Sequence, residues 1–207
     1  MNKITLSGFK LLLVLAIIII LASCENSTEN KNPKPAGTDV FPDKVGDKWT
    51  YAVFDSLTNT TDTLNVQIVG TTLSTNNKSL KIWIFNSRTF NDSMFVSVTD
   101  SAVYFYEDRN ATFLNQEIEF PLEINKFWIN PHLQFDSTKV TAKESVTVPA
   151  DTYPDAYRLE RTWLSLNVHG HSITWFVDNI GIVKLYQRIQ GFDNINQTRE
   201  LLSYVVQ

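Results

Sequence analysis

Apolar and polar residues alternate with a period of two along most of the chain after residue 40, and this alternation constrains the fold more than any other feature. In TLNVQIV, residues 63–69, the apolar side chains of Leu64, Val66 and Ile68 share one face. The same pattern recurs in LKIWIF (80–85), MFVSV (94–98) and VYFYE (103–107). Successive side chains of a strand point to opposite faces, so this period indicates half-buried strands. Turn-forming stretches such as DSLTNTTD and STNNKS separate the runs, which is typical of hairpins and meanders.

The later part of the chain continues this pattern, and no long amphipathic helix interrupts it. Further strands are expected in residues 137–148, 156–168, 172–177, 181–189 and 198–206. The pattern changes phase within 156–168, where a β-bulge near Arg161 and Thr162 would restore one buried face. Several strands carry large apolar groups on both faces. We therefore expect an all-β domain over residues 40–207, a single antiparallel sheet curved into a half-barrel or open barrel, with a β-sandwich as the alternative.

One phrase occurs twice, first as FPDKVGDKWTY (41–51) and again as FPLEINKFWIN (120–130). The proline ends whatever precedes it. Gly46 and Asn125 occupy equivalent positions and are residue types that readily adopt a positive φ. A tryptophan follows three residues later in both copies. We interpret each phrase as a tight turn that leads into a strand whose first tryptophan enters the core, and a duplicated half-domain is the alternative.

The N-terminal segment has the features of a targeting signal. MNK is followed by an apolar run, Leu11 to Ala22, which is shorter than the roughly 20 residues of a membrane span and suits a signal-peptide core. Ala22 and Ser23 precede Cys24, the only cysteine of the chain, and this arrangement resembles the lipobox of bacterial lipoproteins. The resemblance implies a signal peptide over residues 1–23 and a lipid on Cys24. An ordinary secretory signal or a signal anchor is the alternative.

Residues 24–39 are expected to form the lipid anchor and a flexible tether, because the segment has no aliphatic side chain larger than alanine. The formal net charge of the chain is −4, and it becomes −6 when the signal leaves with Lys3 and Lys10. This acidic balance gives no indication of nucleic-acid binding. We expect attachment to a membrane through the lipid on Cys24 and no nucleic-acid partner.

Three phrases in order resemble a known family. FPDKVGDKWTY, VTVPADTYPDAYRLE (146–160) and TWFVDNIGIVKLYQR (174–188) together resemble lipid-anchored β proteins of Bacteroidota, which have a Gly-x-x-Trp opening and a Val-Pro-Ala-Gly-Thr-Phe-like core motif. Such domains are similar to the half-barrel of periplasmic lipoprotein carriers. Asp151 stands where that family usually has glycine. The resemblance implies a location at the outer membrane, facing the periplasm or the cell surface, and it implies no particular activity.

Few residues suggest catalysis or metal binding. His169 and His171 in NVHGHS are candidates for zinc, but Gly170 between them favours a hairpin tip with exposed imidazoles. The sequence has no Gly-x-Ser-x-Gly motif and no phosphate-binding glycine loop, and its single cysteine lies at the lipidation position. We expect no enzyme activity, no catalytic residues, no metal and no cofactor, with an enzyme as the least favoured function.

The chain contains 13 Phe, 7 Tyr and 5 Trp, which is enough for a core and for a ligand surface. A plain β core is the simplest explanation. The alternative is a concave face that takes a lipid or acyl chain, lined by Trp83, Phe85, Phe95, Tyr104 and Tyr106. We therefore expect a non-catalytic binding or carrier role for an apolar ligand at the outer membrane. The alternative is a structural or interaction scaffold within an envelope protein complex.

Overall fold

The computed structural model describes residues 40–130, 135–165, 168–191 and 194–207. The predicted signal peptide, Cys24 and the tether lie outside these ranges. Twelve strands form one sheet: β1 (Lys48–Asp55), β2 (Thr60–Leu73), β3 (Ser79–Asn86), β4 (Asn91–Val98), β5 (Ala102–Tyr106), β6 (Leu114–Glu119), β7 (Phe127–Ile129), β8 (Ser137–Val148), β9 (Asp151–Ser165), β10 (Val168–Val177), β11 (Gly181–Gln190) and β12 (Ile195–Val205).

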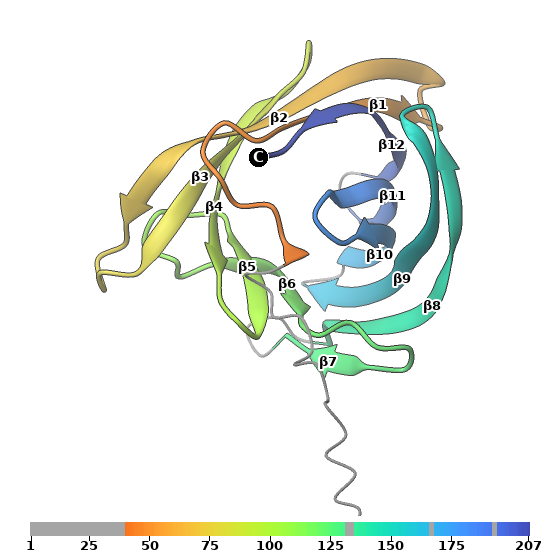
Figure 1. Ribbon diagram of the computed structural model, residues 1–207. Coiled ribbons are helices and arrows are strands. Elements are labelled where there is room, and N and C mark those ends of the chain that lie inside the picture. Colours follow the sequence, from red (N-terminus) through yellow and green to blue (C-terminus); the bar gives the residue numbers. More distant parts are fainter. Residues whose placement is uncertain (1–39, 131–134, 166–167, 192–193) are drawn as a thin grey trace, which may run out of the picture. The chain divides into compact units, whose positions relative to one another are not determined.

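The sheet is antiparallel throughout, and among the described residues each strand pairs with its neighbours in sequence, except that β6 does not pair with β7. β1 also pairs with β12, so the order across the sheet is β6-β5-β4-β3-β2-β1-β12-β11-β10-β9-β8-β7. Figure 1 shows this sheet curling into a nearly closed barrel, in which β6 and β7 are the two edges. The prediction of one curved antiparallel sheet is confirmed, and the sandwich alternative is not adopted.

The duplicated phrase forms two turns with matching hydrogen bonds. The Gly46 amide donates to the Ile68 carbonyl at 2.8 Å, and the Asn125 amide donates to the Val140 carbonyl at 2.8 Å. Both residues have positive φ, 106° for Gly46 and 72° for Asn125. The turns lead into β1 and β7, whose tryptophans Trp49 and Trp128 are 2% and 5% exposed. The predicted turn, strand start and buried tryptophan are therefore confirmed in both copies.

Replacing Gly46 with alanine is expected to lower the free energy of unfolding by about 1–2 kcal/mol, because a Cβ is disfavoured at this positive φ. Gly70→Ala is the matched control: Gly70 lies in β2 without a positive φ, and the nearest atom to an added Cβ is 4.0 Å away. Urea unfolding followed by tryptophan fluorescence measures both. Equal stabilities for the two variants would contradict the role assigned to the Gly46 turn.

Side chains bridge the gap between the two edge strands. Among the described residues no backbone ladder joins β6 to β7. Instead the Trp128 indole Nε1 donates to the Glu117 carbonyl of β6 at 3.2 Å, and the Arg161 guanidinium of β9 donates to the Asn115 carbonyl. Arg161 also binds both carboxylate oxygens of the buried Asp136 at 2.8 Å. Side chains of the second half of the sheet thus satisfy part of the edge of the first half.

The predicted bulge near Arg161 and Thr162 is wrong. β9 pairs with β10 without a shift through both residues, and the irregularities lie between β8 and β9, at Val140/Ala142 and at Glu144/Val146. Arg161 instead continues the buried face of Leu159, which a polar/apolar pattern does not anticipate for an arginine.

The segment before β1 closes one end of the barrel. Figure 1 shows this segment, in orange, running inside the ring of strands. The Phe41 ring is 4% exposed and stacks on Phe176, with 6.1 Å between ring centroids. The Asn179 amide holds the chain at this point by donating to the Val40 carbonyl at 2.7 Å. Side chains therefore fill the interior at the end where the described chain begins.

Candidate ligand-binding site

A cavity of about 280 Å³ lies inside the barrel, and Phe41 of the segment before β1 lines one end of it. Its base is aromatic. Trp49 and Trp83 stack with 5.0 Å between ring centroids, and Phe41 packs on Trp83 at 5.8 Å. The Trp49 indole is fixed by donating to the Ile180 carbonyl at 2.7 Å. The rigid base of the cavity thus consists of side chains from β1, β3 and the segment before β1.

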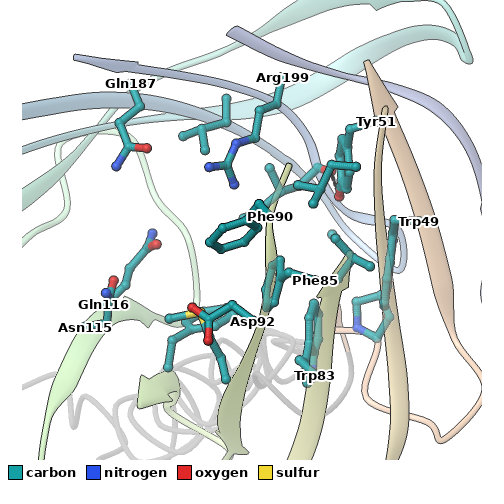
Figure 2. A pocket seen from close by; sticks show the side chains of 18 of the residues that line it. Trp49, Tyr51, Trp83, Phe85, Phe90, Asp92, Asn115, Gln116, Gln187 and Arg199 are labelled. Carbon is teal, nitrogen blue, oxygen red and sulfur yellow. Dashed lines mark hydrogen bonds between the residues drawn. The ribbon is translucent and has the colours of Figure 1, made fainter. Parts of the chain in front are cut away.

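The wall of the cavity divides into an apolar side and a polar side (Figure 2). Tyr51 and Phe85 continue the apolar side from Trp49 and Trp83. The polar side carries four side chains that can donate hydrogen bonds: Asn115, Gln116, Gln187 and Arg199. Small-molecule sites combine an apolar lining with a few polar groups in this way.

Arg199 places a cation against this apolar interior. It lies on β12 opposite Val53 of β1, and in Figure 2 its guanidinium points into the cavity. Burial lowers the pKa of Arg199, and the nearby Tyr51 acts in the opposite direction. Burial likewise raises the pKa of the Tyr51 phenol, whose hydroxyl donates to the Ile182 carbonyl at 2.8 Å. Arginine stays protonated in proteins, so the cavity contains a positive charge.

A second cavity of about 280 Å³ adjoins the first and shares Leu64, Phe90 and Arg199 with it. Polar residues line this outer cavity, among them Asp55, Asp62, Thr60, Ser87, Thr89 and Gln197. The interior-facing residues therefore become more polar from the Trp49 level toward the turns that precede β2 and β12. Arg199 lies at the boundary between the two cavities.

The carboxylates of the outer cavity have local hydrogen-bond donors. Asp55 accepts from the Leu57 amide at 2.8 Å and from the Thr58 amide at 3.2 Å. Asp62 accepts from the Thr63 amide at 2.8 Å and from the Thr89 hydroxyl at 3.1 Å. Backbone hydrogen bonds hold the pKa of each carboxyl below its usual range. Asp55 thus stabilises the turn between β1 and β2, and Asp62 links β2 to Thr89 in the segment before β4.

The structure divides the five aromatic residues predicted to line one face between the two faces of the sheet. Trp83 and Phe85 line the cavity. Phe95, Tyr104 and Tyr106 instead pack on the opposite face, in a separate cluster with Leu80 and Leu114. The reason is parity: on β4 the cavity side belongs to Met94 and Val96, so Phe95 points away. The expectation of one shared face is corrected, and ligand contact stays a prediction for Trp83 and Phe85.

On the outer face, the Lys78 ammonium organises two of these aromatics. It donates to the Tyr106 hydroxyl at 2.7 Å and lies 4.8 Å from the ring centroids of both Tyr104 and Tyr106. The two rings stack on each other at 6.3 Å. This contact gives the outer cluster a structural role.

His169 and His171 lie within β10, so their predicted place at a hairpin tip is corrected. Gly170 between them is covered by the Trp163 ring, which would be 1.8 Å from an added Cβ. The His171 ring packs edge-on against Tyr186. In the described ranges, no group of three or more His, Cys, Asp or Glu side chains is placed to hold a metal ion.

Several cavity residues were not predicted, most notably Trp49 as part of the lining and Arg199. The parity of TRELL contains a signal for Arg199, because Leu201, two residues later on β12, is fully buried. An arginine that shares a strand face with a buried leucine is unusual, because arginine side chains are mostly exposed. The described part of the chain also contains no helix that is long and apolar enough to cross a membrane.

Comparison with solved structures gives matches at low sequence identity. A protein described as exported, with a YmcC-like fold, from Bacteroides fragilis matches with a TM-score of 0.49 and 13% identity, over 80% of this chain and 98% of that chain. A protein described as a lipoprotein from Parabacteroides distasonis matches with a TM-score of 0.48 and 11% identity, over 83% and 99%. Protein-family models and curated protein sequences give no match. The fold assignment accordingly rests on the strand pairing itself.

Proposed function

We propose that the chain is a lipid-anchored envelope protein whose barrel interior binds the apolar chain of a small amphiphile, in a non-catalytic binding or carrier role. The observation that carries this proposal is the aromatic cavity of about 280 Å³ inside the sheet. A filled β core has few voids larger than a water molecule. Room for about nine groups of water size, at roughly 30 Å³ each, suits one short chain.

Two donors at the cavity support a ligand that is partly polar. The Trp83 Nε1 and the Arg199 Nε are both buried, and neither has a hydrogen-bond partner among the described residues. Both residues line the cavity. Buried polar groups are normally paired, so an unpaired donor at a cavity favours a bound molecule that accepts from it.

The non-catalytic part of the proposal follows from the lining. Asp92 is an exposed carboxylate at the cavity, and in Figure 2 it lies on the other side of the cavity from Arg199. Asp55 and Asp62 are committed to backbone amides. A general acid or base needs a neighbour within hydrogen-bond reach of the reacting group. The carboxylates of the cavity are therefore not arranged as a catalytic acid and base, and the lining is better suited to binding.

The proposal includes attachment to the outer membrane, which the N-terminal sequence supports. Cys24→Ala is expected to move the protein from the membrane pellet to the soluble fraction, because a thiol that carries acyl chains provides the anchor. Ser27→Ala, three residues later, is the matched control and should stay in the pellet. Fractionation followed by a carbonate wash measures both variants. A Cys24→Ala protein that resists the wash would contradict the anchor.

Native mass spectrometry of protein purified from its own membrane, combined with solvent extraction, tests the binding role. A co-purifying molecule with an apolar chain is the expected result. Leu64→Trp, which adds bulk at the cavity wall, should lower its amount. Leu57→Trp makes the same change at an exposed turn position and should not. Equal amounts in both variants, or protein that never carries a ligand, would contradict the proposal.

A scaffold role is the second candidate, and the β7 edge favours it. Phe127 and Ile129 on this short edge strand are 56% and 61% exposed, and Phe135 beyond them is 69% exposed. Exposed apolar side chains on an edge strand, whose outer side has no partner strand, are typical of interaction surfaces. Crosslinking in the native membrane distinguishes the two roles. Specific protein adducts through Phe127, from a chain that carries no ligand, would favour the scaffold.

A further inference from the structure

Arg199 has no counter-charge in the described part of the chain. No carboxylate there lies within ion-pair distance of its guanidinium, and its Nε is buried without a hydrogen-bond partner. Arg161, which is buried whereas Arg199 is half-buried, has a counter-charge in both oxygens of Asp136 at 2.8 Å. A half-buried charge with a buried, unpaired Nε is favourably completed by an acceptor from outside the chain.

The acids that line the two cavities with Arg199 do not pair with it. Asp55 and Asp62 line the outer cavity with it, but Asp55 accepts from the Leu57 and Thr58 amides of its own turn. Asp62 accepts from the Thr63 amide of its own strand and from the Thr89 hydroxyl. Asp92 lies across the inner cavity and is exposed. Tyr51, the ionisable group that interacts with Arg199 most closely, is a neutral phenol whose hydroxyl donates to a carbonyl.

We infer that the cavity selects amphiphiles with an anionic head group, and that Arg199 binds this group while the chain extends down to Trp49 and Trp83. This inference rests on the proposed function and specifies its ligand class. The guanidinium lies at the boundary of the two cavities, with the aromatic base on one side and the polar rim on the other. Carboxylate and phosphate share the geometry that an arginine fork recognises.

The polar side of the cavity is suited to the same head group. Gln187 of β11 points into the cavity from the same side as Arg199, and Gln116 faces them from β6 (Figure 2). The amides of Gln187 and Gln116 can donate to the oxygens that the guanidinium leaves free, whereas the Asn115 amide already donates to Glu107 at 2.8 Å. A cationic head group would meet Arg199 with like charge, and a neutral alcohol would leave its charge uncompensated.

The test compares ten-carbon amphiphiles on the full chain held in nanodiscs of phosphatidylcholine, with tryptophan fluorescence as the readout. The probes are decanoate, decyl phosphate, decanol and decyltrimethylammonium. The partition of each probe is measured in nanodiscs without protein and is subtracted, so that comparisons between probes as well as between variants report binding to the protein. We expect decanoate or decyl phosphate to bind roughly ten- to a hundredfold more tightly than decanol, as for a hydrogen bond to a charged group. The stronger of the two anions identifies the head group as carboxylate or phosphate.

Arg199→Met should abolish this preference, because it removes the charge but keeps an unbranched apolar side chain, so decanol binding should persist. Arg188→Met removes a charge from an exposed position on β11 and is the matched control, with the preference unchanged. Arg199→Lys should keep a weaker preference for anions, since an ammonium lacks the fork. If Arg199→Met does not fold, Arg199→Lys and the comparison of anions with decanol on the wild type still test the role of Arg199.

Different results would contradict the inference about the head group and the proposed function. Equal binding of decanol and both anions to the wild type, or an anion preference that survives Arg199→Met, would overturn the inference and leave the proposed function standing. Tighter binding of decyltrimethylammonium than of the anions would overturn it as well. If none of the four probes binds, the proposed function fails together with the inference.

Discussion

Replacing Arg161 with methionine is expected to lower the free energy of unfolding by about 3–5 kcal/mol, one of the largest effects of any single substitution in this chain. Asp136 is 1% exposed and has both oxygens bound by Arg161 at 2.8 Å. Methionine leaves that carboxylate buried without its cation and removes the donor to the Asn115 carbonyl at the β6 edge. Urea unfolding followed by tryptophan fluorescence measures the change.

Arg158→Met, on the same strand, is the matched control. Arg158 pairs with Glu160 and Glu144, but its side chain is 26% exposed, so the expected loss is at most about 1 kcal/mol. The double variant Arg161→Met with Asp136→Leu should recover most of the stability, because a buried ion pair can be replaced by apolar groups of similar volume. If Arg161→Met and Arg158→Met unfold alike, the role given to Arg161 in closing the barrel is wrong.

Replacing Trp49 with alanine is expected to reduce stability by about 3–5 kcal/mol, the range for removing a buried tryptophan from a packed core. Trp49 is 2% exposed, stacks on Trp83 and donates to the Ile180 carbonyl. The substitution also enlarges the cavity at its base, so binding of a ten-carbon chain should weaken through lost contacts. Urea unfolding and the fluorescence titration measure the two effects separately.

Trp49→Phe separates packing from hydrogen bonding. It keeps an aromatic ring against Trp83 but leaves the Ile180 carbonyl without its donor, so the expected loss is about 1–2 kcal/mol. A loss from Trp49→Phe as large as that from Trp49→Ala would show that the hydrogen bond, and not the packing, gives this residue its importance.

Much of the fold was predictable from local pattern. The alternation around Leu64, Val66 and Ile68 predicted a strand, and all three are buried on one face of β2. The positive φ of Gly46 and Asn125 followed from residue type and spacing. The pairing of β1 with β12 was not predictable, because it joins segments far apart in the sequence and local periodicity carries no information about register between them.

The site was only half predictable, for a reason that the aromatics of β3 to β5 illustrate. Trp83 and Phe95 are both large aromatic residues of neighbouring strands, β3 and β4, whose residues alternate between the two faces. They point to opposite faces because Trp83 pairs with Met94, whereas Phe95 pairs with Ile82. Aromatic content alone does not distinguish an interior face from an outer cluster. Arg199 was missed because an arginine in a strand is normally read as solvent-facing, and only its parity with Leu201 indicates otherwise.

The repeated turn has a counterpart in the topology. Its two copies begin β1 and β7, the first strands of two consecutive runs of six, and these runs meet at the β1–β12 pair. The hydrogen bonds from Asp47 to Lys44 and from Lys126 to Glu123, at 3.0 and 2.9 Å, match as well. This correspondence favours the interpretation that the sheet consists of two related half-domains.

A crystal structure of the protein with 10-bromodecanoate tests the central claim most directly, because the anomalous signal of bromine locates the end of the chain. The account predicts a bromine peak inside the barrel near Trp49 and Trp83, with the carboxylate against Arg199. A bromine peak confined to the outer surface, for example at the β7 edge, with an interior closed by side chains, would contradict it.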